Sequence, residues 1–362
     1  MLIKKKEIAL LLIFLSLVVT NLFAENYYFK RYDKENGLSQ QTVFCAVQDR
    51  RGFLWFGTKV GLNRFDGTKF KNYVADPEQP NSLPNNTVLA LAEAPDGSLW
   101  LGTSDGLCIY NPEKDTFAPF VSADLTIEGL IDNLVFDKQG NLWVINSKGI
   151  YCLDVKNGNH KFFSASDFFV PTGITVTQSG SVWVLGLDGN IYLFNPQRME
   201  FSFYPILTKE EKTKHILLYR ILECSNGDLV VTTDRIGARR FSPNNGEVKV
   251  LFSNDSQNNP IYIHTAIQRN KDEFWFGTES GIHIYQLDLG FIDHLQKSYN
   301  DAYSLSDNAV HMLLKDREEG IWVGTFFGGV NYLSNNNTLF DKYLPKDEKG
   351  LSLIHISEPT RH

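Results

Sequence analysis

The sequence predicts an all-β fold assembled from seven similar repeats, and three observations support this prediction. One motif, which reads GFLWFGTKVGLNRF at residues 52–65, recurs along the chain. Its central apolar positions are Trp55, Trp100, Trp143, Trp183, Val230, Trp275 and Trp322. The steps between these positions are 45, 43, 40, 47, 45 and 47 residues. A nearly fixed period of this size is typical of repeat architectures, in which each copy is one supersecondary unit.

Each repeat is expected to contain four short antiparallel strands, as the second repeat illustrates. Residues 87–92 form an apolar run, and a Pro-Asp-Gly turn separates them from a strand at 98–103. A Ser-Asp-Gly turn leads to a third strand at 107–110, which ends at Asn-Pro because proline cannot donate a hydrogen bond to a sheet. Residues 116–121 alternate apolar and polar side chains, as a half-exposed outer strand does. Four strands in a period of about 40–45 residues form one blade of a β-propeller.

Seven copies predict one seven-bladed β-propeller over residues 25–345. The tryptophans are expected to pack between blades rather than to stack on a ligand. Residues 27–32 and 339–344 both resemble the outer strand at 69–73, although one ring needs only one of them. If residues 27–32 close the ring, residues 339–344 lead into a further unit, and residues 346–352 would start another repeat.

The two ends of the chain are interpreted separately from the ring. Residues 1–24 are predicted to be a signal peptide, because lysines at 4–6 precede an apolar run at 8–19 and Ala24 offers a cleavage site. A membrane anchor is the alternative, but the apolar run is shorter than the roughly 20 residues that a span needs. Residues 353–362 do not continue the repeat, and we interpret them as a non-native tail similar to translated sequencing-adaptor read-through.

Composition limits the possible partners and cofactors. The formal net charge is −7, and no basic block follows the lysines of the leader, so a nucleic-acid partner is not expected for this domain. Cysteines are predicted to be small core residues rather than disulfides; they are Cys45, Cys108, Cys152 and Cys224. Neither a CxxC nor an HExxH motif occurs, so the spacing indicates no metal site and no cofactor.

Catalytic motifs are also missing from the sequence, which contains no GxSxG elbow and no phosphate-binding loop. Recurring aspartates precede the tryptophan motif and are expected to stabilise turns; they are Asp49, Asp96, Asp137 and Asp316. His264 and His311 begin first strands, which line the central channel of a propeller. Both are expected to be solvated polar groups, with bases or ligands of a lyase-type propeller as the alternative.

Ligands of propellers bind where the turns between second and third strands gather at one end of the axis. These turns contain Lys59, Asp105, Lys148, Asp188, Arg235, Glu279, Phe326 and Phe327. Lys59, Lys148 and Arg235 could meet an acidic glycan, or they could be ordinary solvated turn residues. Phe326 and Phe327 could form a docking surface for a sugar ring or a second domain, with one ring folded back on the core as the alternative. No catalytic residue is assigned.

The repeat resembles the two-component regulator propeller family. The family pattern G-x-L-W-x-G-T, preceded by Gly-Leu-Ser and a strand containing valine, is clearest from Asn36 to Thr58 and returns after Asn81 and Tyr303. The third to fifth copies depart from it, because Ile145-Asn146 and Leu185-Gly186 replace Gly-Thr and the fifth copy lacks tryptophan. The resemblance covers about residues 27–352.

This resemblance implies an extracytoplasmic sensor without catalysis of its own. Proteins of this family are periplasmic regions of hybrid two-component systems of Bacteroidetes, with a second propeller, a β-sandwich, a membrane helix and a histidine kinase. Many respond to oligosaccharides in polysaccharide utilisation, and the full-length protein is expected to be a homodimer. A secreted lyase or lactonase using His264 and His311, and a non-catalytic adhesion or scaffold propeller, are the alternatives.

Overall fold

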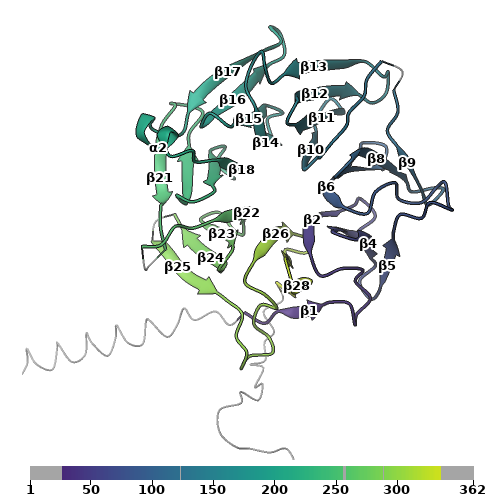
Figure 1. The fold of residues 1–362 in the computed structure, drawn as a ribbon. Helices are drawn as coiled ribbons and strands as arrows, with labels where there is room; N and C mark the ends of the chain where they lie inside the picture. Colours follow the sequence, from purple (N-terminus) through teal and green to yellow (C-terminus); the bar gives the residue numbers. More distant parts are fainter. Residues whose placement is uncertain (1–26, 123, 256–257, 288, 336–362) are drawn as a thin grey trace, which may run out of the picture.

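The computed structural model describes residues 27–335, except residues 123, 256–257 and 288, and forms a ring of seven four-stranded antiparallel sheets around a central channel (Figure 1). The first strands lie nearest the axis and are β2 (Val43–Gln48), β6 (Val88–Glu93), β10 (Asn133–Phe136), β14 (Pro171–Val176), β18 (Leu218–Glu223), β22 (Ile263–Gln268) and β26 (Val310–Lys315). The second strands are β3 (Leu54–Thr58), β7 (Leu99–Thr103), β11 (Asn141–Asn146), β15 (Val182–Gly186), β19 (Leu229–Thr233), β23 (Glu273–Thr278) and β27 (Ile321–Thr325). We number the blades one to seven in this order, so that β2 begins blade one.

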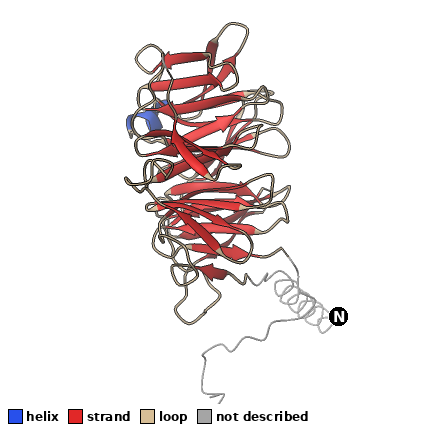
Figure 2. Cartoon of the chain, turned by 90° about the vertical axis from the view of Figure 1, so that its right-hand side faces the viewer, coloured by secondary structure: helices blue, strands red, loops and turns tan. Residues whose placement is uncertain are grey.

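The outer half of each blade completes the sheet. The third strands are β4 (Gly61–Phe65), β8 (Gly106–Asn111), β12 (Gly149–Asp154), β16 (Asn190–Asn195), β20 (Ala238–Phe241), β24 (Gly281–Gln286) and β28 (Val330–Leu333). The outer strands are β5 (Phe70–Tyr73), β9 (Thr116–Pro119), β13 (His160–Ser164), β17 (Glu200–Pro205), β21 (Val248–Phe252), β25 (Gly290–Leu295) and β1 (Lys30–Tyr32). The described residues contain one short helix, α2 (Lys209–Thr213), at the edge of the ring (Figure 2). Nowhere in this part of the chain is a helix long and apolar enough to cross a membrane. The predicted seven-bladed β-propeller is confirmed.

The N-terminal strand closes the ring. β1 pairs with β28 of blade seven in antiparallel register, with Lys30 opposite Tyr332 and Tyr32 opposite Val330. Of the two candidate segments left open by the sequence, residues 27–32 therefore supply the closing strand. The other predicted segments, which are the signal peptide at 1–24, the strand at 339–344, the repeat start at 346–352 and the tail at 353–362, lie outside the described residues.

The six tryptophans pack between blades, as predicted. Their exposed fractions lie between 0% for Trp275 and 5% for Trp100. Trp55 belongs to a cluster that joins blade one to Leu101 and Tyr110 of blade two. Its indole N–H donates to the Asp49 carboxylate at 2.9 Å. The other oxygen of that carboxylate accepts hydrogen bonds from two backbone N–H groups of the turn, so one side chain fixes both the turn and the indole.

The aspartate turn recurs, which confirms its predicted structural role. Asp137 and Asp316 accept the indole N–H of the tryptophan of their own blade at 2.9 and 2.8 Å. Asp96 occupies a different position in its turn and accepts from Ser98 instead. In blade five, where Val230 replaces tryptophan, Val230 is fully buried and Arg240 on the paired strand forms an ion pair with Asp228.

The structure explains why the motif has glycine followed by threonine: the glycine avoids a steric clash, and the threonine makes a hydrogen bond. A Cβ added to Gly57 would lie 2.8 Å from the carbonyl oxygen of Val88, because the next blade's first strand approaches the backbone there. The Thr58 hydroxyl donates to the Gly61 carbonyl at 2.8 Å and closes the turn into the third strand. An added Cβ would also lie close to a carbonyl oxygen of the next blade at Gly102 and Gly277, and close to the Val43 side chain at Gly324.

The four cysteines are free, in agreement with the prediction that they do not form disulfides. Cys108 and Cys224 are buried, whereas Cys45 and Cys152 are partly buried. Burial raises the pKa of each thiol to about 12, so these groups stay protonated at neutral pH.

Candidate functional site

A β-bulge that recurs in six of the seven blades presents one side chain from each at the same end of the central channel. The register of six first strands shifts by one residue relative to the second strand. The unpaired residues are Phe44, Leu89, Thr172, Tyr219, His264 and His311. Bulges re-aim side chains and are frequent beside functional sites. The turns between second and third strands lie at this end, which we call the channel mouth.

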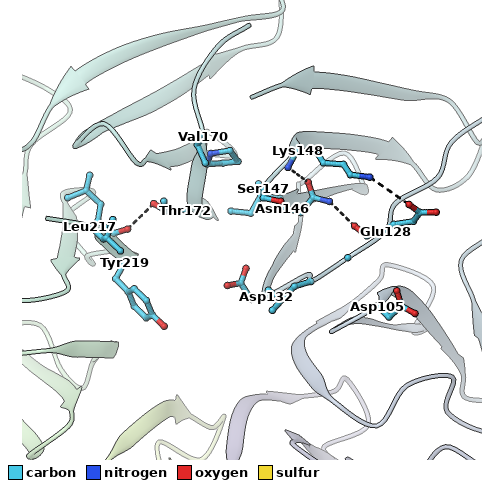
Figure 3. Close-up of a pocket in the computed structure, with 15 residues that line it drawn as sticks. Asp105, Glu128, Asp132, Asn146, Ser147, Lys148, Val170, Thr172, Leu217 and Tyr219 are labelled. Atoms are coloured by element: carbon cyan, nitrogen blue, oxygen red, sulfur yellow. Dashed lines mark hydrogen bonds and ion pairs between the residues drawn. The ribbon is translucent and has the colours of Figure 1, made fainter. Parts of the chain in front are cut away.

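A cavity of about 700 Å³ opens at the channel mouth beside blades two to five (Figure 3). Blade two contributes Asp105 from its turn, and the chain entering blade three contributes Glu128 and Asp132. The remaining lining comes from residues 145–148, 170–172 and 217–219. This volume falls within the range of small-ligand sites, which combine apolar walls with a few placed polar groups.

The polar wall of the cavity is built around Asn146. Its amide N–H₂ donates to the Glu128 carbonyl at 3.2 Å, and its amide oxygen accepts the backbone N–H of Lys148 at 2.9 Å. The Lys148 ammonium lies 3.7 Å from the Glu128 carboxylate, and these side chains are 59% and 67% exposed. Asn146 is therefore fixed, whereas the charged pair in front of it is accessible to a bound molecule (Figure 3).

Apolar side chains line the rest of the cavity, and Tyr219 lies across it from the charged pair in Figure 3. Leu130 is 53% exposed, Val170 37% and Tyr219 36%. The Tyr219 side chain projects into the opening in Figure 3. The exposed phenol ring offers both a flat apolar face and a hydroxyl group to a ligand.

Arg220 connects blades that are not neighbours. Its guanidinium donates to Asn133 of blade three at 3.0 Å and to the backbone carbonyl of His264 in blade six at 3.2 Å. Because Arg220 itself belongs to blade five, the bond to Asn133 reaches past blade four, whereas the bond to His264 joins neighbouring blades. Together they link blades three, five and six immediately beside the cavity.

The sixth and seventh blades bring His264, Glu279 and His311 together. His264 Nε2 lies 2.6 Å from Glu279 Oε1, and His311 Nε2 lies 3.8 Å from the same oxygen. The two imidazole rings stack with centroids 4.2 Å apart and an interplanar angle of 15°. Burial, with a contribution from His264, lowers the pKa of His311 to about 4. Tyr219 forms an edge contact with His264 at 5.7 Å, so this cluster adjoins the cavity.

The structure separates the sequence-predicted ligand residues into three groups. Lys148 lines the cavity. Phe326 packs against His311 with ring centroids 5.2 Å apart. Lys59, Arg235 and Phe327 take part in neither site; Arg235 pairs with Asp234 at 3.2 Å, and Phe327 is 69% exposed.

Sequence reasoning named all three residues of the histidine cluster and Asp105 and Lys148 of the cavity, but it missed the other residues of the cavity. Glu128 and Asp132 lie in an irregular connection that the repeat pattern does not cover, so no sequence signal pointed to them. Tyr219, however, occupies the same strand position as His264 and His311. Aligning the first strands of all blades could have identified Tyr219 as a channel-mouth residue.

Comparisons with known proteins agree with the fold and the repeat. The family model described as two component regulator propeller matches residues 37–59, 82–105 and 304–327. Histidine kinase P4 of Formosa agariphila is 49% identical over 53 residues, which are 15% of this chain and 4% of that protein. The matched residues 37–59 include the Gly-Thr pair whose steric and hydrogen-bonding roles are described above.

Solved structures extend the comparison to the whole ring. The extracellular domain of a putative hybrid two component system from B. thetaiotaomicron is 26% identical, with a TM-score of 0.72 over 86% of this chain and 42% of that one. Virginiamycin B lyase from Staphylococcus aureus is 12% identical, with a TM-score of 0.66 over 85% of this chain and 99% of the lyase, which shows a shared fold alone. The chain thus spans less than half of the sensor domain and a small part of the kinase.

Proposed function

We propose that this chain, which carries two-component regulator propeller repeats, is an extracytoplasmic ligand-sensing module of a hybrid two-component sensor histidine kinase. It binds its ligand without catalysing a reaction, and it acts in the periplasm. In the full-length protein it adjoins a second propeller and a β-sandwich within a homodimer. Ligand binding favours one arrangement of that dimer and thereby sets the activity of the kinase, because a ligand shifts an equilibrium by its differential affinity for the two states.

The cavity at the channel mouth is the observation that carries this proposal. It combines the fixed amide of Asn146, the accessible charges of Lys148 and Glu128, and the exposed ring of Tyr219. The side chains come from four blades, so a ligand that contacts both walls joins parts of the ring that are distant in sequence. Such a site can bind a molecule and stabilise one arrangement of the propeller relative to its neighbours.

We further propose an oligosaccharide as the ligand class. Sugar rings present hydroxyl groups at their edges and apolar C–H faces, and this combination matches amide and carboxylate groups opposite an aromatic ring. Lys148 would favour a ligand carrying a carboxylate, whereas Asp105, Glu128 and Asp132 would favour hydroxyl donors. A nucleic acid is disfavoured by these three acidic side chains.

Isothermal titration calorimetry of the purified protein with short neutral and uronic-acid-containing oligosaccharides tests the proposal. One class should bind, and Tyr219→Ala should weaken its affinity about tenfold, or about 1.4 kcal/mol. Tyr299→Ala is the matched control, because Tyr299 is 92% exposed and does not line the cavity. Failure of every oligosaccharide to bind, or equal affinity of Tyr219→Ala and the wild type, would contradict the site.

A further inference from the structure

We infer that His264, Glu279 and His311 form a binding site for a divalent transition-metal ion of the zinc type at the channel mouth. The site is distinct from the 700 Å³ cavity, and its existence does not depend on the oligosaccharide proposed above. The inference starts from geometry, because one ligand atom from each of the three side chains lies within 4.8 Å of the other two.

The distances fit a site that closes around an ion through a small movement. Metal–nitrogen and metal–oxygen bonds of zinc are about 2.0–2.2 Å, which places neighbouring ligand atoms roughly 3 Å apart. Glu279 Oε1 already lies 2.6 Å from one imidazole nitrogen and 3.8 Å from the other. An ion between these atoms would replace the His264–Glu279 hydrogen bond and draw both rings toward one centre.

The sheet fixes the backbone positions of the two histidines, whereas both imidazole rings and the Glu279 carboxylate have to turn toward a common ion. His264 and His311 occupy bulges in adjacent first strands, and their rings stack on each other. Phe326 packs on the His311 ring from the turn of blade seven. The Glu279 side chain is 52% exposed and lies in a turn, so its rotamer can change at little cost. Two imidazoles on fixed backbone positions and one adjustable carboxylate form an open donor set.

The donor types select the class of metal. Two imidazoles with one carboxylate suit zinc and related transition metals, whereas calcium and magnesium prefer sites made of oxygen ligands. Three protein ligands also leave a coordination position for water or for an oxygen of another molecule, as in zinc sites that are not purely structural. The Tyr219 contact with His264 places the three side chains beside the cavity.

The surrounding charges are compatible with a bound cation. Asp307 and Arg220 both lie close enough to act electrostatically on His311, and their charges are opposite, negative for Asp307 and positive for Arg220. The Arg220 guanidinium is engaged by Asn133 and by the backbone carbonyl of His264, and it contributes no hydrogen bond to Glu279. The Glu279 carboxylate therefore supplies negative charge for the ion.

Zinc titration of the chelator-treated, dialysed protein tests this inference. Calorimetry should give one zinc ion per chain, and cobalt(II) should give visible d–d absorption of a low-coordinate nitrogen–oxygen site. Glu279→Gln and His311→Gln should each weaken zinc binding at least about tenfold. His160→Gln is the matched control, since His160 lies on outer strand β13 of blade three, and it should bind zinc as the wild type does.

The variants also separate loss of a ligand from loss of folding. Glu279→Gln keeps the size of an exposed turn residue, so its circular dichroism and unfolding midpoint should match the wild type while zinc binding falls. Absence of zinc binding at millimolar concentration would overturn the inference. Equal affinities of Glu279→Gln, His311→Gln and His160→Gln would overturn it as well, because the bound zinc would then lie elsewhere.

Discussion

Two parts of the ring differ in how closely they follow the repeat. Blades one, two, six and seven, which we call the regular blades, retain glycine at the close-approach position of the second strand. Blades three, four and five, the divergent blades, have Ile145, Leu185 and Thr232 there. The cavity lies mainly among the divergent blades, and Ile145 itself lines it. Departure from the repeat therefore coincides with space for a ligand.

In blade three the divergence is confined to the channel mouth. At the opposite end of blade three, Asp137 still accepts the indole N–H of Trp143, as Asp49 does for Trp55 in a regular blade. Blade four compensates for its leucine with Gly173 on the facing strand, where an added Cβ would lie 2.9 Å from Leu185. Packing between the blades is thus maintained although the residues at the channel mouth differ. The repeat therefore has positions that stabilise the fold and other positions whose residues can vary to form a site.

The largest expected effect tests the steric role of the regular blades. Gly57→Ala places a methyl group in close contact with the Cys45 sulfur and 2.8 Å from the Val88 carbonyl oxygen, so the first strands of blades one and two must both adjust. We expect the free energy of unfolding to fall by about 3 kcal/mol, as for overpacking of a close-packed interior. Urea denaturation followed by tryptophan fluorescence measures this change.

A second glycine provides the control for backbone effects. Gly246 has a φ of 73° and no atom within 4 Å of an added Cβ, so Gly246→Ala should cost only about 1 kcal/mol of backbone strain. Equal losses for the two variants would show that the close approach at Gly57 is not what retains glycine, and the comparison between regular and divergent blades would lose its steric basis.

The next effect concerns acid sensitivity, which we expect to originate in the regular blades. His283 in β24 is 4% exposed, and its ring centroid lies 4.0 Å from that of His294. Burial, followed by the charge of His294, lowers the pKa of His283 from 6.5 to about 4, while Asp255 acts in the opposite direction. The folded state therefore binds fewer protons than the unfolded state between these two pKa values.

Because the folded pKa is lowered, this stability is present above pH 6.5 and is lost as the pH falls toward 4. Between pH 7 and pH 5 the free energy of unfolding should decrease by about 2 kcal/mol through this group. Urea denaturation at both pH values measures the loss, and His283→Gln should reduce the pH dependence by that amount. A variant with the same pH dependence as the wild type would place the acid sensitivity elsewhere in the ring.

The fold was predictable from sequence because its main determinants are periodic. Tryptophan at a regular interval identified the second strands, and Gly-containing turns placed the strands on either side. The closing strand was predictable as one of two candidates, since Tyr32 repeats the character of an outer strand. The choice between them needed the observed pairing of β1 with β28, because the local pattern of residues 339–344 is the same.

The sites were less predictable because they join residues from different repeats. Lys148 was proposed from its position in a turn, but its partner Glu128 comes from an irregular connection. His264 and His311 were recognised as channel residues, yet their stacking and their shared contact with Glu279 depend on the bulges of two adjacent strands. Metal-binding motifs are recognised by short spacings, whereas His264 and His311 are 47 residues apart in the sequence. Motif spacing therefore gave no indication of the metal site proposed above.

The smallest expected effect concerns the charged pair at the cavity rim in blade three. Lys148→Ala removes an ion pair between two side chains that are more than half exposed, with 3.7 Å between their charged atoms. Because solvent screens such a pair, the free energy of unfolding should change by less than about 0.5 kcal/mol. Urea denaturation at low and high salt measures this, with little difference expected. A loss above about 1 kcal/mol would mean that the ion pair holds the rim rigid. A change near zero would mean that each charged side chain can leave the other and contact a bound ligand at little cost in stability.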